Sequence, residues 1–358
     1  MKILVTGGAG FIGSHVVERM AQEGHQVLAV DSFARTAILG EHFLGKSVAR
    51  YNWEHIGKLP GVTLLEADVR DTSAMDRAIR DAEAVVHTAA QVAVTTSVKD
   101  PRTDFDINVV GTVNVMEAAR KAGSNPVVIF CSTNKVYGDH VNQIPVRAQK
   151  TRYVFDDSAF AQGIPESLPI DHCHHTPYGV SKLAADLYVQ EYARSYGIPT
   201  AVFRMSCIYG TRQFGGEDQG WVAHFALSAL AGRPLTIYGD GKQVRDVLFV
   251  DDLVGAYNSY LDRASQLGGQ VFNIGGGANF TLSLVELLSQ LEGQLKRTIQ
   301  VSSADWRPAD QKVYISDIRK AREKLEWSPT VSPEEGVRRL LGWALSDGQL
   351  SGMLQPHT

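Results

Sequence analysis

The N-terminal stretch MKILVTGGAGFIGSHVVERMAQEGHQVLAVD, residues 1–31, contains the pattern that decides the fold. An apolar run at residues 3–5 is followed by a glycine-rich turn, a helical pattern over residues 13–22 and a second apolar run at residues 27–30. Apolar runs without alternating polar positions are typical of strands buried on both faces. The order strand, turn, helix, strand therefore predicts the first unit of a parallel sheet covered by helices.

The glycine-rich turn has the spacing of a dinucleotide-binding loop. Gly8, Gly10 and Gly13 match G-x-G-x-x-G, in which glycine lets the backbone turn tightly and approach a pyrophosphate. Asp31 ends the second apolar run, eighteen residues beyond Gly13, where a carboxylate can accept hydrogen bonds from the adenosine ribose. A carboxylate there also repels a 2′-phosphate, so we expect NAD rather than NADP. The alternative is a glycine-rich turn without a ligand, which this placement disfavours.

The same alternation continues through the first half of the chain. Apolar runs at residues 62–66, 84–87 and 127–131 accompany a helical pattern over residues 105–122. They predict an α/β fold, with a doubly wound parallel sheet of the Rossmann type.

The second half of the chain predicts a smaller α/β lobe that is interleaved with the first. We expect residues 1–188 to form the dinucleotide-binding domain and residues 189–358 to form mainly the second lobe. Apolar runs recur at residues 200–207 and 247–250, so segments near residues 200–207 and 245–262 are predicted to return to the first domain.

Residues 138–175 differ from the rest of the chain. They show no sustained period and contain Pro145, Pro165 and Pro169. A segment this long without clear structure is typical of a functional or mobile loop. Its end, residues 171–175, reads DHCHH, but this spacing matches no zinc pattern, so we predict no metal site. Thr176-Pro177 then predicts the start of a helix, with a hydroxyl at the N-cap and proline at the first helical position.

The composition excludes several partners. The 358 residues have a formal net charge of −4, which supplies no broad basic field for nucleic acid. No apolar run approaches the roughly 20 residues that span a bilayer. The three cysteines, Cys131, Cys173 and Cys207, are too few and scattered for a disulfide framework. We therefore expect a cytoplasmic protein without nucleic-acid or membrane partners.

A tyrosine and a lysine four residues apart suggest proton-transfer chemistry. Tyr178 and Lys182 would lie on one face of the predicted helix. Tyrosine has an ordinary pKa of about 10, and a nearby ammonium and a positively charged nicotinamide ring would lower it. Thr133, just after the apolar run at residues 127–131, offers a hydroxyl that can hold a substrate oxygen.

These motifs together resemble the extended short-chain dehydrogenase/reductase family. The resemblance is carried by residues 6–13, 131–138, 178–182 and 245–246 and extends over nearly the whole chain. It implies that Thr133, Tyr178 and Lys182 act together, that the first lobe binds NAD and that the second binds a nucleoside-diphosphate sugar. It also implies a homodimer formed through helices of the first lobe, including residues 105–122.

The motifs and the resemblance together predict two sets of contacts. The predicted NAD contacts are Gly7, Gly10, Phe11, Ile12, Gly13, Asp31, Asp68, Val69, Ala89, Ala90, Gln91, Asn108, Ser132, Tyr178 and Lys182. The predicted substrate contacts are Thr133, Asn134, Cys207, Gln219, Trp221, Tyr238, Arg245 and Arg307.

Several members of the substrate set have alternative interpretations. Arg245 and Arg307 suit a diphosphate because guanidinium groups bind phosphate oxygens bidentately, and the alternative for each is an ion pair with the protein. Trp221 and Tyr238 either stack on the substrate or belong to the core. Cys207 stands where many relatives have asparagine, which puts the contacts of that side chain in doubt.

Within the family, the resemblance favours epimerisation. Residues 91–97, 132–138, 218–221 and 241–246 resemble members that invert C2 of a CDP-linked deoxyhexose, by transient oxidation to a keto sugar and re-reduction from the opposite face. A 4,6-dehydratase of this family would carry an Asp-Glu pair where this chain has Asn134-Lys135, and these cannot replace an acid/base pair. The alternative within the family is a 4-epimerase or another nucleotide-sugar oxidoreductase. The alternative outside enzymes is a binding protein that senses dinucleotides. The presence of Thr133, Tyr178 and Lys182 disfavours it, because such a protein would not need these residues.

Overall fold

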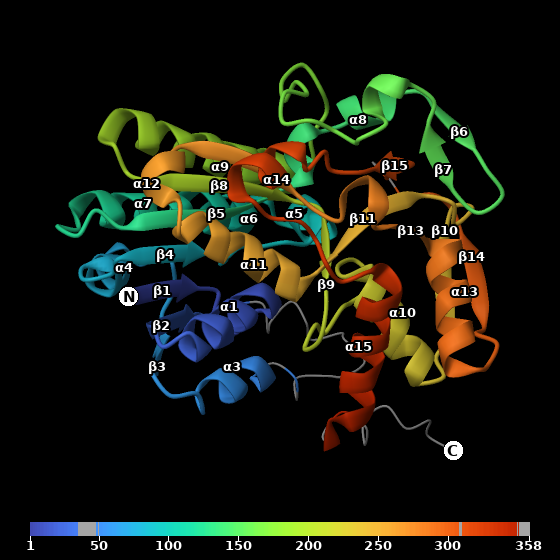
Figure 1. The fold of residues 1–358 in the computed structure, drawn as a ribbon, viewed down its shortest axis with the longest axis horizontal. Helices are drawn as coiled ribbons and strands as arrows, with labels where there is room; N and C mark the ends of the chain where they lie inside the picture. The colour runs from blue at the N-terminus through green and yellow to red at the C-terminus, as the bar shows by residue number, and fades with distance from the viewer. Residues whose placement is uncertain (35–47, 49, 308–309, 349, 351–358) are drawn as a thin grey trace.

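The computed structural model describes residues 1–34, 48, 50–307, 310–348 and 350. Its centre is a seven-stranded parallel sheet in the order β12-β8-β5-β4-β1-β2-β3 (Figure 1). These strands are β1 (Lys2–Thr6), β2 (Gln26–Asp31), β3 (Val62–Glu66), β4 (Ala84–His87), β5 (Val127–Thr133), β8 (Thr200–Met205) and β12 (Gln270–Ile274). The run β3-β2-β1-β4-β5 is the order of a Rossmann fold, so the predicted fold class is confirmed.

Both faces of the sheet are covered by helices, which explains the continuous apolar runs of the strands. On β1, Ile3 and Val5 belong to one buried cluster and Leu4 to the other, because successive side chains point to opposite faces. The first cluster includes residues of α1 (Phe11–Gln22), α3 (Tyr51–Ile56), α11 (Val250–Leu261) and α14 (Arg319–Leu325). The second includes residues of α4 (Thr72–Ile79), α7 (Gly111–Lys121) and α9 (Pro177–Tyr196).

The helix predicted over residues 105–122 is longer than expected and is not uniform. A helical path runs through α6 (Pro101–Phe105), the π-helical turn η3 (Asp106–Val110) and α7, and the short helix α5 (Val94–Lys99) precedes it. The N-cap predicted for α9 is confirmed, since the Thr176 hydroxyl accepts a hydrogen bond from the Gly179 N–H at 3.2 Å.

A second lobe lies beside the carboxyl ends of the large sheet (Figure 1). It contains β9 (Cys207–Tyr209), β11 (Val244–Phe249), β13 (Thr281–Ser283) and β15 (Val313–Tyr314) in one sheet, and β10 (Leu235–Tyr238) paired with β14 (Val301–Ala304) in another. The helices α10 (Trp221–Leu230), α13 (Leu284–Leu295) and α15 (Pro333–Ser346) pack around them. The strand β12 was not predicted, although it joins the large sheet beside β8.

Residues 138–175 contain more regular structure than the sequence suggests. They form α8 (His140–Gln143), a hairpin of β6 (Val146–Ala148) and β7 (Tyr153–Phe155), and the turn η5 (Ser158–Phe160). The hairpin is anchored on α13, where Arg152 Nε donates to Glu286 Oε1 at 2.7 Å. Apolar side chains such as Val141 and Ile164 are buried in a cluster of their own. The segment is therefore more ordered than its lack of periodicity indicates, because its order comes from packing on distant residues.

A buried ion pair joins α9 to the sheet. Arg204 on β8 donates to both carboxylate oxygens of Asp186 on α9, at 3.0 and 3.1 Å, and their side chains are 5% and 0% exposed. The Ser132 hydroxyl donates to the same carboxylate at 2.7 Å. Arg204 also donates to the hydroxyl of Tyr137, which in turn donates to Asn273 on β12. The network therefore joins α9 to three strands at the edge where the predicted catalytic residues lie.

Removal of this charge should destabilise the protein. Arg204→Met keeps a long side chain but leaves the buried Asp186 carboxylate without its cation, so we expect the free energy of unfolding to fall by about 3–5 kcal/mol. Urea denaturation measures this change. Arg338→Met is the control, because Arg338 is 69% exposed in its pair with Glu335 and such a pair contributes about 0–1 kcal/mol. A loss in Arg204→Met no larger than in the control would contradict the prediction.

Candidate active site

The glycine loop between β1 and α1 leaves no room for side chains at its closest approach. Gly7 has φ +72°, in the left-handed region that favours glycine. A Cβ atom on Gly13 would lie 2.1 Å from the Gly7 carbonyl oxygen, so α1 can begin this close to the strand only with glycine there. The N-cap Gly10 offers no side-chain cap, which leaves the first N–H groups of α1 suited to a pyrophosphate.

Asp31 at the end of β2 orders the same loop. Its Oδ2 accepts a hydrogen bond from the Ala9 N–H at 3.0 Å and its Oδ1 accepts one from the Phe33 N–H at 2.8 Å. The carboxylate therefore lies beside the glycine loop, at the position from which it can reach a ribose.

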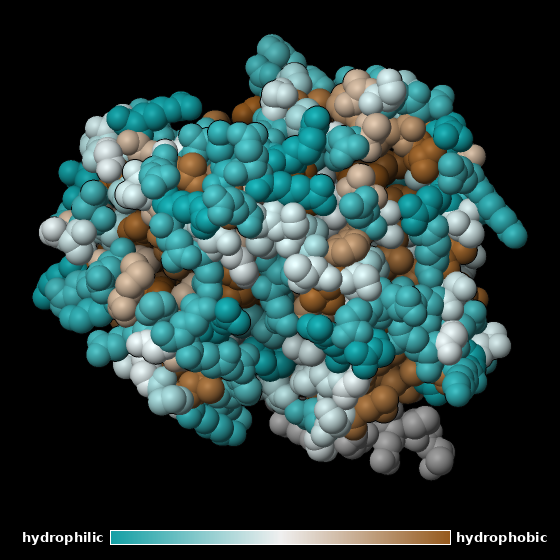
Figure 2. Space-filling model, viewed as in Figure 1, coloured by the Kyte–Doolittle hydropathy of each residue, from teal (hydrophilic) through white to brown (hydrophobic). Residues whose placement is uncertain are grey.

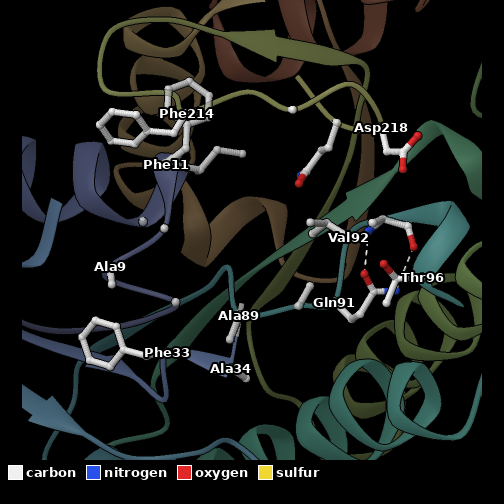
Figure 3. A pocket seen from close by; sticks show the side chains of 18 of the residues that line it. Ala9, Phe11, Phe33, Ala34, Ala89, Gln91, Val92, Thr96, Phe214 and Asp218 are labelled. Atoms are coloured by element: carbon white, nitrogen blue, oxygen red, sulfur yellow. Dashed lines mark hydrogen bonds between the residues drawn. The ribbon is translucent and has the colours of Figure 1, made fainter. Parts of the chain in front are cut away.

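A cavity of about 740 Å³ extends from the glycine loop toward the second lobe, within the size range of ligand sites (Figure 3). It is lined by most of the predicted NAD contacts and by one predicted substrate contact: Gly7, Gly10, Phe11, Ile12, Gly13, Asp31, Asp68, Val69, Ala89, Ala90, Gln91 and Gln219. Figure 3 shows Ala9 and Phe11 on one side, Gln91 and Thr96 on the other, and Asp218 above them.

Other lining residues were missed by the sequence analysis. They include Ser32 and Phe33 beyond β2 and Arg212, His224 and Arg233 from the second lobe. Ser32 and Phe33 follow directly after Asp31, so the rule that ligands bind beyond the carboxyl ends of parallel strands could have found them. No local signal marks the three residues of the second lobe.

Four predicted NAD contacts are not among the residues that line the cavity: Asn108, Ser132, Tyr178 and Lys182. Asn108, in the turn η3, accepts from the Gln91 N–H at 2.9 Å and donates to the Gln91 carbonyl and the Ser181 hydroxyl, both at 3.0 Å. It therefore holds the lining segment against α9. The hydroxyl of Ser132 donates to Asp186 and is directed into the buried network.

The fold brings Thr133, Tyr178 and Lys182 together. Thr133 ends β5, and Tyr178 and Lys182 occupy successive turns of α9, which packs against that strand. The Thr133 hydroxyl is near enough to the Tyr178 phenol to lower the pKa of that phenol. Lys182 Nζ donates to the Cys131 carbonyl at 2.7 Å and lies 4.2 Å from the centre of the Phe130 ring.

Burial dominates the titration of this group. It raises the pKa of Tyr178 to about 12, against the opposing effect of the Thr133 hydroxyl. It also lowers the pKa of Lys182 to about 8. The sequence predicts that Lys182 and a positively charged nicotinamide ring together lower the pKa of Tyr178. In the structure the ammonium is directed at the Cys131 carbonyl instead, so the residues of the chain leave the phenol protonated at neutral pH.

The predicted substrate residues fall into separate groups. Asn134 Oδ1 accepts from the Thr133 hydroxyl at 3.3 Å. Cys207 on β9 accepts from the Trp221 indole N–H at 3.4 Å, and Arg245 on β11 forms an ion pair with Asp310 at 2.6 Å.

The remaining pair lies farther out in the second lobe. The guanidinium of Arg307 lies 4.0 Å from the centre of the Tyr238 ring and pairs with Glu217 and Asp218. The phenol of Tyr238 also donates to Glu217. In this structure each of the two predicted phosphate-binding arginines is thus already paired with a carboxylate.

Among the described residues, no group of three or more histidine, cysteine or carboxylate side chains is placed to hold a metal ion. In the same part of the chain, no helix is both long and apolar enough to cross a membrane.

Comparison with known proteins decides the family. The model of the NAD dependent epimerase/dehydratase family matches residues 3–275. The chain belongs to this family. It is therefore an enzyme of an NAD-dependent family, which sets aside a purely dinucleotide-sensing protein.

The relatives are nucleotide-sugar enzymes. CDP-paratose 2-epimerase of Salmonella typhi is 38% identical over 353 residues, which cover 97% of this chain and 100% of that protein. UDP-glucose 4-epimerase of Mycolicibacterium smegmatis is 33% identical over 341 residues, covering 95% and 97%. The structure of UDP-glucuronic acid 4-epimerase from Bacillus cereus, in complex with UDP-glucuronic acid and NAD, matches with a TM-score of 0.79, 28% identity and coverage of 96% and 98%. The predicted family is confirmed, and the predicted resemblance to members that act at C2 of a CDP-linked sugar is confirmed by the similarity to CDP-paratose 2-epimerase.

The glycine loop gives a direct test of the cofactor cradle. In Gly13→Ala the new methyl group meets the Gly7 carbonyl and the Thr88 hydroxyl, so the loop must move, and we expect NAD affinity to fall at least about tenfold. Fluorescence titration with NAD measures the change. Gly123→Ala is the matched control, since its added Cβ meets nothing within 4 Å. Unchanged NAD affinity in Gly13→Ala would count against this site.

Proposed function

We propose that this enzyme inverts C2 of a CDP-linked deoxyhexose, by transient oxidation to a keto sugar and re-reduction from the opposite face. The observation that carries the proposal is the meeting of Thr133, Tyr178 and Lys182 at the carboxyl edge of the sheet, next to a dinucleotide cradle. The choice of carbon and nucleobase is supported by similarity to CDP-paratose 2-epimerase over the full length of that protein.

The residues of the cradle fit NAD. The uncapped start of α1, which glycine at residue 13 allows so close to β1, suits the pyrophosphate, and the Asp31 carboxylate suits the ribose. Bound NAD supplies hydride-transfer chemistry, and its positive ring in the oxidised form favours a phenolate nearby.

Thr133, Tyr178 and Lys182 have different roles in the proposed proton transfer. Tyr178 takes the proton of the sugar hydroxyl and later returns it, while the Thr133 hydroxyl holds the oxygen in place. The pKa of about 12 means that phenolate is scarce in the chain alone, so the proton moves only in a site that compensates the negative charge. Lys182 contributes positive charge from the next turn of α9 and is held by the Cys131 carbonyl.

The proposed substrate contacts lie in the second lobe and at the end of β5. We assign the diphosphate and the sugar to Asn134, Cys207, Gln219, Trp221, Tyr238, Arg245 and Arg307. For the two arginines to bind phosphate, the substrate must compete with the carboxylates of Asp310, Glu217 and Asp218 that now pair with them.

A 4-epimerase is the second candidate. UDP-glucose 4-epimerases are 32–33% identical to this chain, and that of Thermotoga maritima with UDP-glucose matches in structure with a TM-score of 0.78 and 32% identity. The two candidates predict different products, so analysis of the product separates them.

A homodimer and a cytoplasmic location complete the proposal. Exposed apolar side chains on α5, α6, η3 and α9 suit a helical interface with a second copy: Val98, Phe105, Val110, Val180, Leu187 and Tyr188. The face drawn in Figure 2 is instead mainly hydrophilic, with hydrophobic side chains in small groups. A monomeric mass in light scattering would contradict the dimer.

Product analysis in heavy water tests both the carbon and the route. CDP-, UDP-, GDP- and dTDP-sugars are incubated with enzyme and NAD, and NMR assigns the inverted carbon and its label. We expect inversion at C2 of a CDP-deoxyhexose with no solvent deuterium at C2, because the hydrogen on this carbon never becomes an exchangeable proton. Inversion at C4 would support the second candidate. Deuterium at the inverted carbon would exclude transient oxidation.

Tyr178→Phe tests the proton-transfer residue. The variant should keep its fold and its NAD affinity but lose about 10²–10⁴-fold in turnover, the usual contribution of a positioned acid or base. Tyr196→Phe on the same helix is the control, because Tyr196 is 54% exposed and should show unchanged turnover. Near-normal turnover in Tyr178→Phe would refute the assignment.

A further inference from the structure

Lys135 is a cation at the catalytic end of β5 that the proposed mechanism does not use. It lies in the turn η4 (Asn134–Tyr137), two residues after Thr133, and its N–H donates to the Thr133 hydroxyl at 3.3 Å. Its side chain is partly buried. The ammonium makes one long hydrogen bond, to Gln311 Oε1 at 3.4 Å. Within the described residues it has no ion pair, so two of its three N–H donors lack a protein acceptor.

The charges around Lys135 favour an anion. Asp310 attracts the ammonium, Arg245 repels it, and the Cys207 thiol is the third titratable group that faces it. Asp310 is already paired with Arg245 at 2.6 Å, so two cations share one carboxylate. Burial, with a smaller contribution from Arg245, lowers the pKa of Lys135 to about 8. A partly desolvated cation that shares its counter-charge with an arginine is costly, and a bound anion would lower that cost.

Arg245 is less available than Lys135 for this anion. Its NH1 donates to the carbonyls of Val244 and Gln311, at 2.8 and 2.6 Å, and its NH2 donates to Asp310. The guanidinium therefore holds the backbone around Gln311 in place. The side chain of Gln311 accepts the hydrogen bond of Lys135. By holding Gln311, Arg245 therefore helps to position the Lys135 ammonium without occupying the other N–H donors of that ammonium.

The chemistry of the proposed substrate places an anion here. In a nucleoside-diphosphate sugar, only C1 and its oxygen separate C2 from the nearest phosphorus. When C2 faces Thr133 and Tyr178, the sugar-bound phosphate must lie close to the end of β5. When C4 faces them, the sugar ring stands between the reacting carbon and the phosphate. A cation two residues after Thr133 is thus placed for a sugar presented by C2.

We propose that Lys135 binds the sugar-bound phosphate of the substrate. This inference rests on the proposed function, since it takes a nucleotide sugar reacting at C2 as the ligand. It adds a specificity-determining contact that neither the glycine loop nor the Thr133, Tyr178 and Lys182 group supplies.

Calorimetric titration with CDP and CMP tests the contact without catalysis. CDP has the phosphate that carries the sugar in the substrate, and CMP lacks it. Lys135→Met should weaken CDP binding by about 10- to 100-fold, the range for loss of a charge-assisted hydrogen bond, and leave CMP binding unchanged. Lys135→Arg should restore most of the CDP affinity. Lys312→Met is the matched control, because Lys312 is an exposed lysine next to Gln311 and should leave both affinities unchanged.

A pH series gives a second readout that a structural role would not produce. Because the ammonium loses its charge as pH rises through about 8, the CDP affinity of the wild type, relative to CMP, should fall above that pH. Lys135→Met should show no such step. The thermal midpoint of each variant shows whether it is folded under the titration conditions.

The outcomes separate this inference from the proposed function. If Lys135→Met binds CDP like the wild type, or weakens CMP and CDP equally, Lys135 does not hold the sugar-bound phosphate, while the epimerase proposal stands. If the wild type prefers uridine nucleotides, the UDP and UMP pair gives the same comparison. If the wild type binds no nucleoside diphosphate, both the inference and the proposed function fail.

Discussion

The contact between Gly13 and the carbonyl of Gly7 sets the distance between the first strand and the first helix. Any side chain at residue 13 would overlap that carbonyl, so α1 can start this close to β1 only with glycine at residue 13. The start of α1 then forms one wall of the cavity, and Asp31 on the neighbouring strand is close enough to hydrogen-bond the Ala9 N–H. The cofactor cradle is therefore a consequence of backbone packing, with one carboxylate that orders it.

The proposed catalytic group, Thr133, Tyr178 and Lys182, depends on a second constraint, the position of α9 on the sheet. Thr133 belongs to β5, whereas Tyr178 and Lys182 belong to a helix that begins 44 residues later in the chain. Asp186 on that helix is held by Arg204 and Ser132, and Asn108 holds Ser181 from the other side. These buried polar contacts fix both the depth and the rotation of α9. Burial that is tight enough to do this also raises the pKa of Tyr178, so precision of position has an electrostatic cost that a ligand charge must offset.

The basic side chains around the proposed substrate site differ in their partners before a substrate binds. Arg245 and Arg307 are paired with carboxylates, whereas the Lys135 ammonium makes only one hydrogen bond within the described residues. In the proposed complex, the carboxylates that now pair with the two arginines are the groups that the substrate diphosphate would displace.

The amino-acid sequence by itself determined the parts that depend on local pattern. The apolar runs of the first five strands, the glycine loop, Asp31 and the Thr176-Pro177 start of α9 could all be predicted, because strand burial, tight turns and helix caps are set by neighbouring residues. Tertiary structure alone decided the place of β12, the order within residues 138–175, the inward direction of Ser132, the ion pairs of Arg245 and Arg307, and the surroundings of Lys135. Each of these depends on partners far away in the chain, such as Asp310 for Arg245 and Asp186 for Ser132. No local pattern specifies which distant charge or strand a residue will meet.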